Sequence, residues 1–318
     1  MMGAPVIGRG IWAGLILGLA PCMAGAQTVY VASQGAGTLV ALAPGSTSGS
    51  APLAVGRGPA QIAAGPGGQL YLTHPDTGWV TLVDEPGGSI RRTYPVSGQP
   101  FGIAISADGA QLYVGDWTGN RVMRLSAESG NLEGTVPVGR EPAALVLDGR
   151  GTLYVADRES RQVSVVDTTA MARVATIPVG EAPFALTLSP AGDRLYVANV
   201  RGGTVSVIDT AKCRTVATFA VGGMPYGVAV SPDGARILVT DQRAGTLVVV
   251  DAVSGAMVAA VPVGRYPEGV AVAGHRAYVA NWFSDSVSVI DLTTLRETHR
   301  IAVPEGPRSL AVPPGVGR

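Results

Sequence analysis

The stretch GGMPYGVAVSPDGARILVTDQRAGTLVVVD, residues 222–251, decides the fold of this chain. It consists of short runs rich in valine and other β-branched residues, which are typical of strands. Ser231 to Gly234 (SPDG) separates two of these runs and supplies the glycine and side-chain acceptors of a tight turn. The stretch therefore predicts consecutive antiparallel strands joined by hairpins.

The same unit recurs along the chain. Each unit is predicted to hold four short strands, which we call A to D in chain order. In one unit B, C and D are expected at 194–198, 204–209 and 215–219, and strand A of the next unit is expected at 225–230. Strand B carries a tyrosine, or leucine once, at intervals of 40 to 42 residues: Tyr30, Tyr71, Tyr113, Tyr154, Tyr196, Leu238 and Tyr278. Strand A follows a proline at the same intervals: Pro59, Pro100, Pro142, Pro183, Pro225, Pro267 and Pro307. Two independent columns with one period establish seven copies.

The two ends of the chain distinguish a ring from an open solenoid. The repeats begin at a strand B, residues 28–32, and end with an unpaired strand A, residues 307–312. Joining the two completes one unit and removes two open sheet edges, which would otherwise invite aggregation. The sequence therefore predicts an all-β, seven-bladed β-propeller with four antiparallel strands per blade, closed when the C-terminal strand completes the N-terminal blade.

Residues 1–26 have the pattern of a secretory signal peptide. Arg9 precedes an apolar run at 10–20, and Ala24 to Ala26 (AGA) form a cleavage motif. The run is much shorter than the roughly 20 apolar residues that cross a bilayer. No later segment is long enough either, so we expect no transmembrane segment once the signal is removed.

The mature protein is expected to be a propeller at residues 27–312 with a tail at 313–318, located in the periplasm or secreted. Cys22 stands in a motif that departs from a lipoprotein box, which leaves lipid attachment as a minor alternative. Cys213 has no second cysteine in the mature chain. The fold must therefore be stabilised by packing and not by an internal disulfide.

The balance of charged residues limits the classes of partner that the protein is expected to bind. Lys+Arg and Asp+Glu both number 23. A chain without excess positive charge lacks the field that attracts nucleic acid or an acidic membrane. Nucleic acid is therefore disfavoured, and single-stranded DNA stacked on aromatic residues is only a weak third alternative.

Gly222 to Asp251 and Gly264 to Asp291 resemble the YVTN-type β-propeller repeat family. The family pattern is a Gly-x-x-Pro start, a Ser-Pro-Asp-Gly turn, a Tyr-Val-Ala-Asn strand and a Val-Ser-Val-Ile-Asp strand. Ala43 and Ser126 depart from it, because they replace the Asp that ends strand C. The resemblance implies an exported or surface propeller, in some relatives associated with PQQ (quinoprotein) dehydrogenases and in others a docking surface of an enzyme complex.

The sequence contains no complete catalytic constellation. His74, His275 and His299 fall in different parts of their blades, so we propose no metal site built on them. Glycines mark turns and not phosphate loops, and no cofactor is predicted. Acids end strand C in five blades, at Asp84, Asp167, Asp209, Asp251 and Asp291, where they are expected to cap turns.

A polar residue also ends strand B in every blade: Ser33, His74, Asp116, Asp157, Asn199, Asp241 and Asn281. We interpret these residues as hydrogen-bond partners of the next turn. The alternative is a hard cation held by their oxygens at the mouth of the channel. The chain would then be a metal-assisted, lactonase-like hydrolase.

The residues that break the repeat gather in the loops from D to A and from B to C, which lie on one face of a propeller. Aromatic residues and arginines are the residue types that most often anchor binding interfaces. Phe101, Phe184 and Tyr226 directly follow the repeat proline and are also candidates for plugging the channel. Trp117, Trp282 and Phe283 lie farther out and are better candidates for contact. The predicted binding residues are Phe101, Trp117, Arg140, Phe184, Tyr226, Arg265, Tyr266, Trp282, Phe283 and Arg308.

These observations predict a non-catalytic propeller that binds a partner protein or a small polar ligand on this face. The resemblance adds an accessory role in a quinoprotein oxidation system. The hydrolase remains the alternative.

Overall fold

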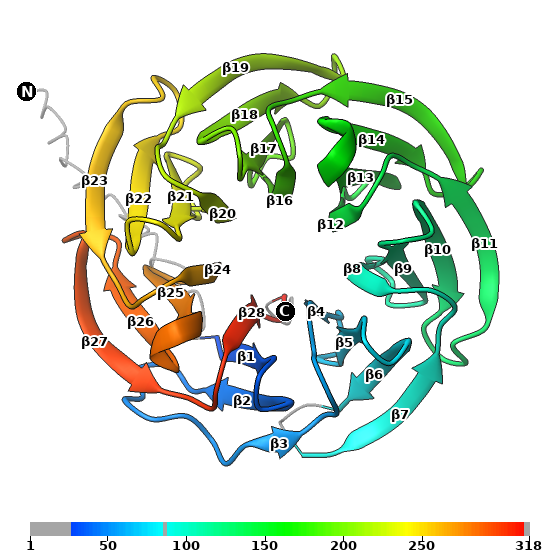
Figure 1. Ribbon diagram of the computed structural model, residues 1–318, viewed down its shortest axis with the longest axis horizontal. Helices are drawn as coiled ribbons and strands as arrows, with labels where there is room; N and C mark the ends of the chain where they lie inside the picture. The colour runs from blue at the N-terminus through cyan, green and yellow to red at the C-terminus, as the bar shows by residue number, and fades with distance from the viewer. Residues whose placement is uncertain (1–26, 85–87, 315–318) are drawn as a thin grey trace, which may run out of the picture.

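The computed structural model describes residues 27–84 and 88–314, which form a ring of seven four-stranded sheets around a central opening (Figure 1). The prediction of an all-β, seven-bladed propeller is confirmed. The expected signal peptide at 1–26, with Cys22, and the tail residues 315–318 lie outside the described residues. Within the described ranges, no helix is long and apolar enough to cross a membrane.

The strands of each blade are stacked outward from the channel. Blade 1 holds, from the innermost strand to the outermost, β28 (Pro307–Ala311), β1 (Val29–Ser33), β2 (Thr38–Leu42) and β3 (Leu53–Ala54). Blade 2 holds β4 (Ile62–Ala64), β5 (Leu70–His74), β6 (Trp79–Val83) and β7 (Ile90–Pro95). Blade 3 holds β8 (Pro100–Ile105), β9 (Gln111–Asp116), β10 (Arg121–Ser126) and β11 (Leu132–Pro137). Blade 4 holds β12 (Pro142–Leu147), β13 (Thr152–Asp157), β14 (Gln162–Asp167) and β15 (Ala172–Pro178).

The remaining three blades follow the same order. Blade 5 holds β16 (Pro183–Leu188), β17 (Arg194–Asn199), β18 (Thr204–Asp209) and β19 (Arg214–Ala220). Blade 6 holds β20 (Pro225–Val230), β21 (Arg236–Asp241), β22 (Thr246–Asp251) and β23 (Met257–Pro262). Blade 7 holds β24 (Pro267–Ala273), β25 (Arg276–Asn281), β26 (Ser286–Asp291) and β27 (Arg296–Ala302). Two short 3-10 helices lie in loops from B to C: η1 (Arg158–Ser160) in blade 4 and η2 (Trp282–Ser284) in blade 7.

Blade 1 closes the ring as predicted. The C-terminal β28 pairs antiparallel with the N-terminal β1, with Tyr30 opposite Ala311 and Val31 opposite Leu310. In Figure 1 the red β28 lies beside the blue β1 at the centre of the ring. The first and last described strands therefore complete one blade, with β28 as its innermost strand.

The core lies between neighbouring blades. Seven clusters of buried apolar side chains fill the seven interfaces of the described ring. Each cluster contains one member of the strand-B column; Tyr71 lies between blades 2 and 3, and Leu238 between blades 6 and 7. The repeat tyrosine is thus a packing residue that joins each blade to the next.

Strand A has a register break shortly after its proline. In blade 4 the pairing with strand B jumps between Pro142 and Leu145, and in blade 6 between Pro225 and Val228. Corresponding breaks occur in blades 1, 3, 5 and 7. Such a break frees the intervening residue from the sheet pairing and redirects its side chain. The residue after the proline therefore does not follow the sheet alternation.

Candidate functional site

The loops from D to A and from B to C lie together on one face, which we call the loop face. In blade 4, for example, the Arg158 N–H donates to the carbonyl of Glu141 in the preceding loop at 3.1 Å. The residues that follow the repeat prolines surround the mouth of the channel on this face. They form the inner ring: Arg308, Ala60, Phe101, Ala143, Phe184, Tyr226 and Glu268, in the order of blades 1 to 7. This ring differs from blade to blade, so its chemistry is not part of the repeat.

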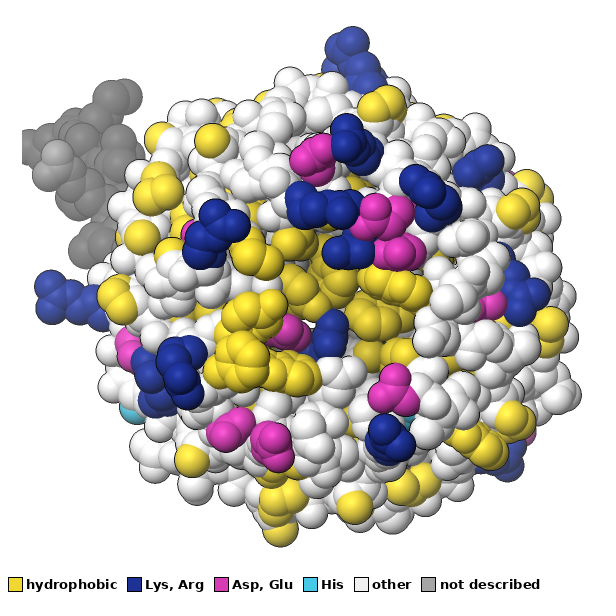
Figure 2. All heavy atoms as spheres, in the orientation of Figure 1, with side chains coloured by type: hydrophobic (Ala, Val, Ile, Leu, Met, Phe, Trp, Pro, Cys, Tyr) yellow, Lys and Arg dark blue, Asp and Glu magenta, His cyan; other side chains and the backbone are white. Residues whose placement is uncertain are grey.

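A second ring covers the first. It consists of the residues that follow strand B, and we call it the outer ring: Gln34, Pro75, Trp117, Arg158, Val200, Gln242 and Trp282. Trp117 packs on Phe101 with ring centroids 4.7 Å apart, and the guanidinium of Arg158 lies 5.8 Å from the Trp117 ring. Figure 2 shows hydrophobic side chains gathered around the central opening, with charged side chains inside it and on one side.

Aromatic side chains close half of the mouth. Phe101 and Phe184 meet edge to face at 5.8 Å, and Phe184 stacks on Tyr226 at 4.2 Å. Phe101 is 9% exposed and Phe184 is 6% exposed. These two side chains therefore serve mainly as packing, as their position after the proline suggested, while Trp117 and Tyr226 are half-buried beside them.

Arg308 lies across the other half of the mouth. Its guanidinium carbon is 5.3 Å from the Phe101 ring of blade 3 and 5.7 Å from the Trp282 ring of blade 7. Nη1 donates to Gln34 Oε1 at 2.7 Å and Nη2 donates to the Tyr226 hydroxyl at 2.6 Å. Burial opposes the charge, but Tyr226 and Glu268 outweigh it and raise the pKa of Arg308. Arg308 is therefore a fixed cation in an aromatic surround.

Glu268 is the buried acid beside Arg308. Its side chain lies 3.4 Å from Arg308, between Glu268 Oε2 and Arg308 Nε, and the residue is 4% exposed. Burial raises the pKa of Glu268 to about 7, even though Arg308 lowers it. Thr240 Oγ1 of the neighbouring blade donates to the Glu268 carbonyl at 2.6 Å and fixes the backbone there. The mouth thus holds a carboxyl group that changes its charge near neutral pH.

Two corners of the loop face share one construction. In blade 7 the Arg265 N–H donates to Ser284 Oγ at 2.8 Å and Arg265 Nη2 donates to the Phe283 carbonyl at 2.7 Å, which braces η2. In blade 4 Arg140 braces η1 through Ser160 Oγ at 2.8 Å and the Glu159 carbonyl at 2.7 Å. The two corners lie on opposite sides of the opening (Figure 1).

The two corners present different side chains. Phe283 is 55% exposed, and its ring centroid lies 5.0 Å from that of Tyr266. In blade 4 Arg158 Nη1 pairs with Glu141 Oε2 at 2.7 Å, and Arg201 pairs with Glu159 at 2.6 Å. One corner is aromatic and the other is charged.

Of the ten predicted binding residues, the structure brings six together at the mouth: Phe101, Trp117, Phe184, Tyr226, Trp282 and Arg308. Arg265, Tyr266 and Phe283 form the aromatic corner, and Arg140 stands apart at the charged corner. Gln34, Gln242 and Glu268 are not among the predicted binding residues. Each occupies the same repeat position as a residue that was predicted, and this was the signal that could have identified them.

The repeated acids have structural roles. Asp116 Oδ1 accepts hydrogen bonds from the backbone N–H groups of Gln99 and Gly119, and Asp241 Oδ1 accepts one from Met224. At the end of strand C, Asp291 Oδ1 accepts from the two following threonines. The interpretation of both acid sets as turn partners is confirmed at these positions. Across residues 27–84 and 88–314, no group of three or more His, Cys, Asp or Glu is arranged to hold a metal ion.

Residues 185–278, from blade 5 into blade 7, match the family of YNCE-like beta-propellers. The chain is similar to the YNCE-like propellers. The predicted resemblance to YVTN-type repeat propellers is confirmed at the level of this family. No curated protein sequence matches the chain significantly.

Several solved structures share the fold. A hydrazine synthase chain of Kuenenia stuttgartiensis is 24% identical with a TM-score of 0.73, over 79% of this chain and 88% of that chain. A functionally unknown protein from Desulfotomaculum acetoxidans is 13% identical with a TM-score of 0.78, over 90% and 99%. The dihydro-heme d1 dehydrogenase NirN, in complex with DHE, is 18% identical with a TM-score of 0.65, over 87% of this chain and 63% of that chain. At such identities the likeness shows the fold alone.

Proposed function

We propose that this chain is an exported, non-catalytic propeller that binds a partner protein on its loop face. The observation that carries the proposal is the aromatic corner of blade 7. Phe283 exposes more than half of its surface while its backbone is held by Arg265: Arg265 Nη2 donates to the Phe283 carbonyl, and the Phe283 N–H donates to the Arg265 carbonyl at 3.2 Å. An exposed aromatic side chain on a fixed backbone loses little conformational freedom on binding, which is the property of an interface anchor.

The charged corner of blade 4 supports the same function. Arg158 pairs there with Glu141 and Glu159, and Arg201 also pairs with Glu159. Arg140 adds a hydrogen bond to the Glu159 carbonyl. Exposed ion pairs add little to folding stability, but they provide orientation and selectivity toward a partner. An aromatic anchor on one side of the opening and mixed charge on the other suit a partner that spans the face.

Two finer parts of the proposal rest on the sequence. Export to the periplasm or secretion rests on the signal pattern of residues 1–26. An accessory role in a quinoprotein oxidation system rests on the resemblance to YVTN-type propellers. The acids considered for the hydrolase alternative at the ends of strand B are engaged within their own blades. Asp116 and Asp241 accept hydrogen bonds from backbone N–H groups of turns, and Asp157 accepts from the side chains of Gln162 and Ser164.

The experiment compares three purified baits: the wild type, Phe283→Ala and Val253→Ala. Val253 is the control, since it is 91% exposed in the loop between β22 and β23 at the opposite end of the blade. Each bait is incubated with an extract of the source organism and retained proteins are quantified by mass spectrometry. A partner of the loop face is retained by the wild type and Val253→Ala and lost with Phe283→Ala.

The candidate partner is then purified and titrated against each variant. Loss of an anchor of about 2 kcal/mol corresponds to roughly a 30-fold weaker Kd for Phe283→Ala. Equal affinity of wild type and Phe283→Ala, or no protein that distinguishes the baits, would refute the proposal. A retained partner that is not a quinoprotein enzyme would remove the accessory role and keep the binding function.

A further inference from the structure

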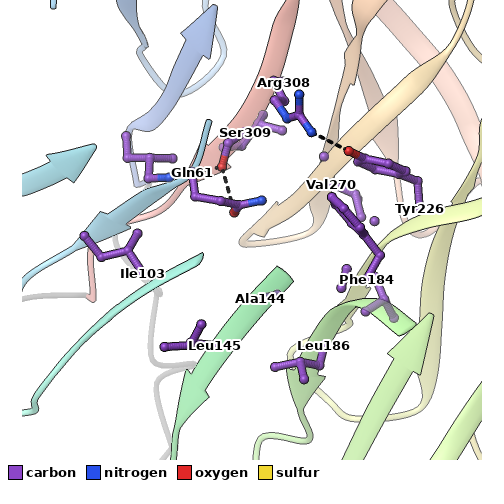
Figure 3. A pocket seen from close by; sticks show the side chains of 16 residues that line it. Gln61, Ile103, Ala144, Leu145, Phe184, Leu186, Tyr226, Val270, Arg308 and Ser309 are labelled. Carbon is purple, nitrogen blue, oxygen red and sulfur yellow. Dashed lines mark hydrogen bonds between the residues drawn. The ribbon is translucent and has the colours of Figure 1, made fainter. Parts of the chain in front are cut away.

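The channel below the mouth contains a hollow of about 210 Å³. Its wall is the third residue after each repeat proline, which we call the aliphatic collar: Ile62, Ile103, Leu145, Leu186, Val228, Val270 and Leu310. Figure 3 shows the Arg308 guanidinium against the Tyr226 hydroxyl at one end of this space, with collar side chains such as Leu145 and Leu186 around it. The wall of the hollow thus combines the aliphatic collar with the polar side chains of Gln61 and Ser309, and Arg308 supplies a cation at one end.

Hydrogen-bonding atoms without partners lie at Arg308, which lines one end of the hollow, and at Glu268 and Gln242 beside it. Arg308 Nε and Glu268 Oε2 have no hydrogen-bond partner within residues 27–84 and 88–314, although they are 3.4 Å apart and oppositely charged. Gln242 Oε1 also has none there, while its Nε2 reaches Glu268 Oε1 at 3.4 Å. Buried polar atoms without partners are costly, so a ligand that supplies the missing partners would gain from satisfying them.

We propose that the channel mouth binds a small aliphatic monocarboxylate, with its head group on Arg308 in place of Glu268 and its tail against the aliphatic collar. This proposal does not rest on the partner protein of the loop face. The head group supplies the acceptor that Arg308 Nε lacks. A charged amine is excluded by Arg308, and a second carboxylate on the tail would be buried in a hollow whose lining, within the described residues, offers no second cation.

Size sets the length of the tail. A cavity of about 150 Å³ is enough to hold benzene. A hollow of about 210 Å³ therefore accommodates a chain of roughly six carbons.

Binding of the carboxylate is coupled to one proton. Two carboxylates beside one guanidinium cannot both stay ionised in a buried site, so Glu268 takes a proton from solvent as the ligand carboxylate displaces it. Burial has already raised the pKa of Glu268 to about 7. Gln242 Nε2 faces Glu268 Oε1, so rotation of the Gln242 amide would bring its Oε1, which lacks a donor, into reach of the new hydroxyl. The other titratable groups facing Glu268 are Arg308, which stays charged, and Tyr226, whose pKa is raised by burial.

The test uses calorimetric titration with hexanoate, hexanol and hexylamine, which share a tail and differ in the head group. Hexanoate is expected to bind and the other two are not. Repeating the titration at pH 8 in two buffers of different ionisation enthalpy should show uptake of close to one proton per bound hexanoate. Equal binding of hexanol, or no binding of hexanoate, would overturn the proposal.

Two variants test separately how the carboxylate head group and the aliphatic tail of the ligand contribute to binding. Glu268→Gln removes the competing carboxylate, so hexanoate should bind about tenfold more tightly than to the wild type at pH 8, without proton uptake and with little difference at pH 6. Val270→Phe fills the collar and leaves Arg308 in place, so hexanoate binding should be lost while the melting temperature stays close to that of the wild type. Proton uptake that is equal in the wild type and Glu268→Gln would exclude Glu268 as the coupled group.

Discussion

Replacing Glu268 with glutamine should reveal a buried carboxyl group that opposes folding above neutral pH. Glutamine has the same shape and can keep a hydrogen bond to Gln242, but it does not ionise. Burial raises the pKa of Glu268 from its ordinary 4.5 to about 7, against the effect of Arg308. This rise corresponds to about 3 kcal/mol of the free energy of unfolding, since each pH unit between the two values contributes about 1.4 kcal/mol.

The sign follows from the protons bound in each state. Between pH 4.5 and about 7 the folded protein keeps the Glu268 proton and the unfolded chain has lost it. The stability contributed by Glu268 is therefore fully present below pH 4.5 and is lost as the pH rises through about 7. Wild type should lose about 3 kcal/mol relative to Glu268→Gln over this window.

The measurement is urea unfolding of both variants in steps from pH 4.5 to 8, and the quantity of interest is the difference between their free energies of unfolding. All other titrating groups are common to both proteins and cancel in this difference. Glu128→Gln is the control, since Glu128 is exposed in the loop between β10 and β11. A difference between wild type and Glu268→Gln that stays constant across the pH range would refute the reasoning.

Two further predictions concern the scaffold. Tyr94→Phe should lower the free energy of unfolding by about 1–2 kcal/mol in urea titrations, because the buried Tyr94 hydroxyl donates to the Ala127 carbonyl of the next blade at 2.6 Å; an unchanged value would contradict it. Gly223→Ala should lower the melting temperature clearly more than Gly192→Ala. Both glycines have positive φ, but a Cβ at Gly223 would overlap the Asp241 carboxylate whereas Gly192 faces open space, so equal losses would exclude the overlap.

The fold could be predicted from the sequence because the repeat columns are packing positions. Tyr71 and its counterparts fill the interfaces between blades. The repeats start with a strand B and end with a strand A, and the pairing of these two strands closes the ring. The irregular elements could not be predicted in this way. β3 has two residues and η1 and η2 replace plain loops, and these features depend on contacts such as the Arg265 brace that no period encodes.

The site could be predicted by location but not by contact. Repeat position placed Arg308 and Phe101 on one face, since both follow a repeat proline. Their contact across the mouth depends on a long side chain reaching from blade 1 to blade 3 over Ala60 of blade 2. It also depends on the register break of strand A, for which we recognised no sequence signal. The importance of Glu268 could not be predicted because it depends on burial, which the sequence does not show. An exposed glutamate at the same position would keep its usual pKa.

The variation of the inner ring has a physical reason. A position repeated identically in seven blades would place seven like side chains around one opening, and seven like charges there would repel one another. Selective chemistry at the mouth therefore requires that the repeat be broken. The chain breaks it unevenly, with Phe101, Phe184 and Tyr226 on one side and the adjacent pair Glu268 and Arg308 on the other. A mouth divided in this way favours a ligand that is itself divided into an apolar part and a charged end.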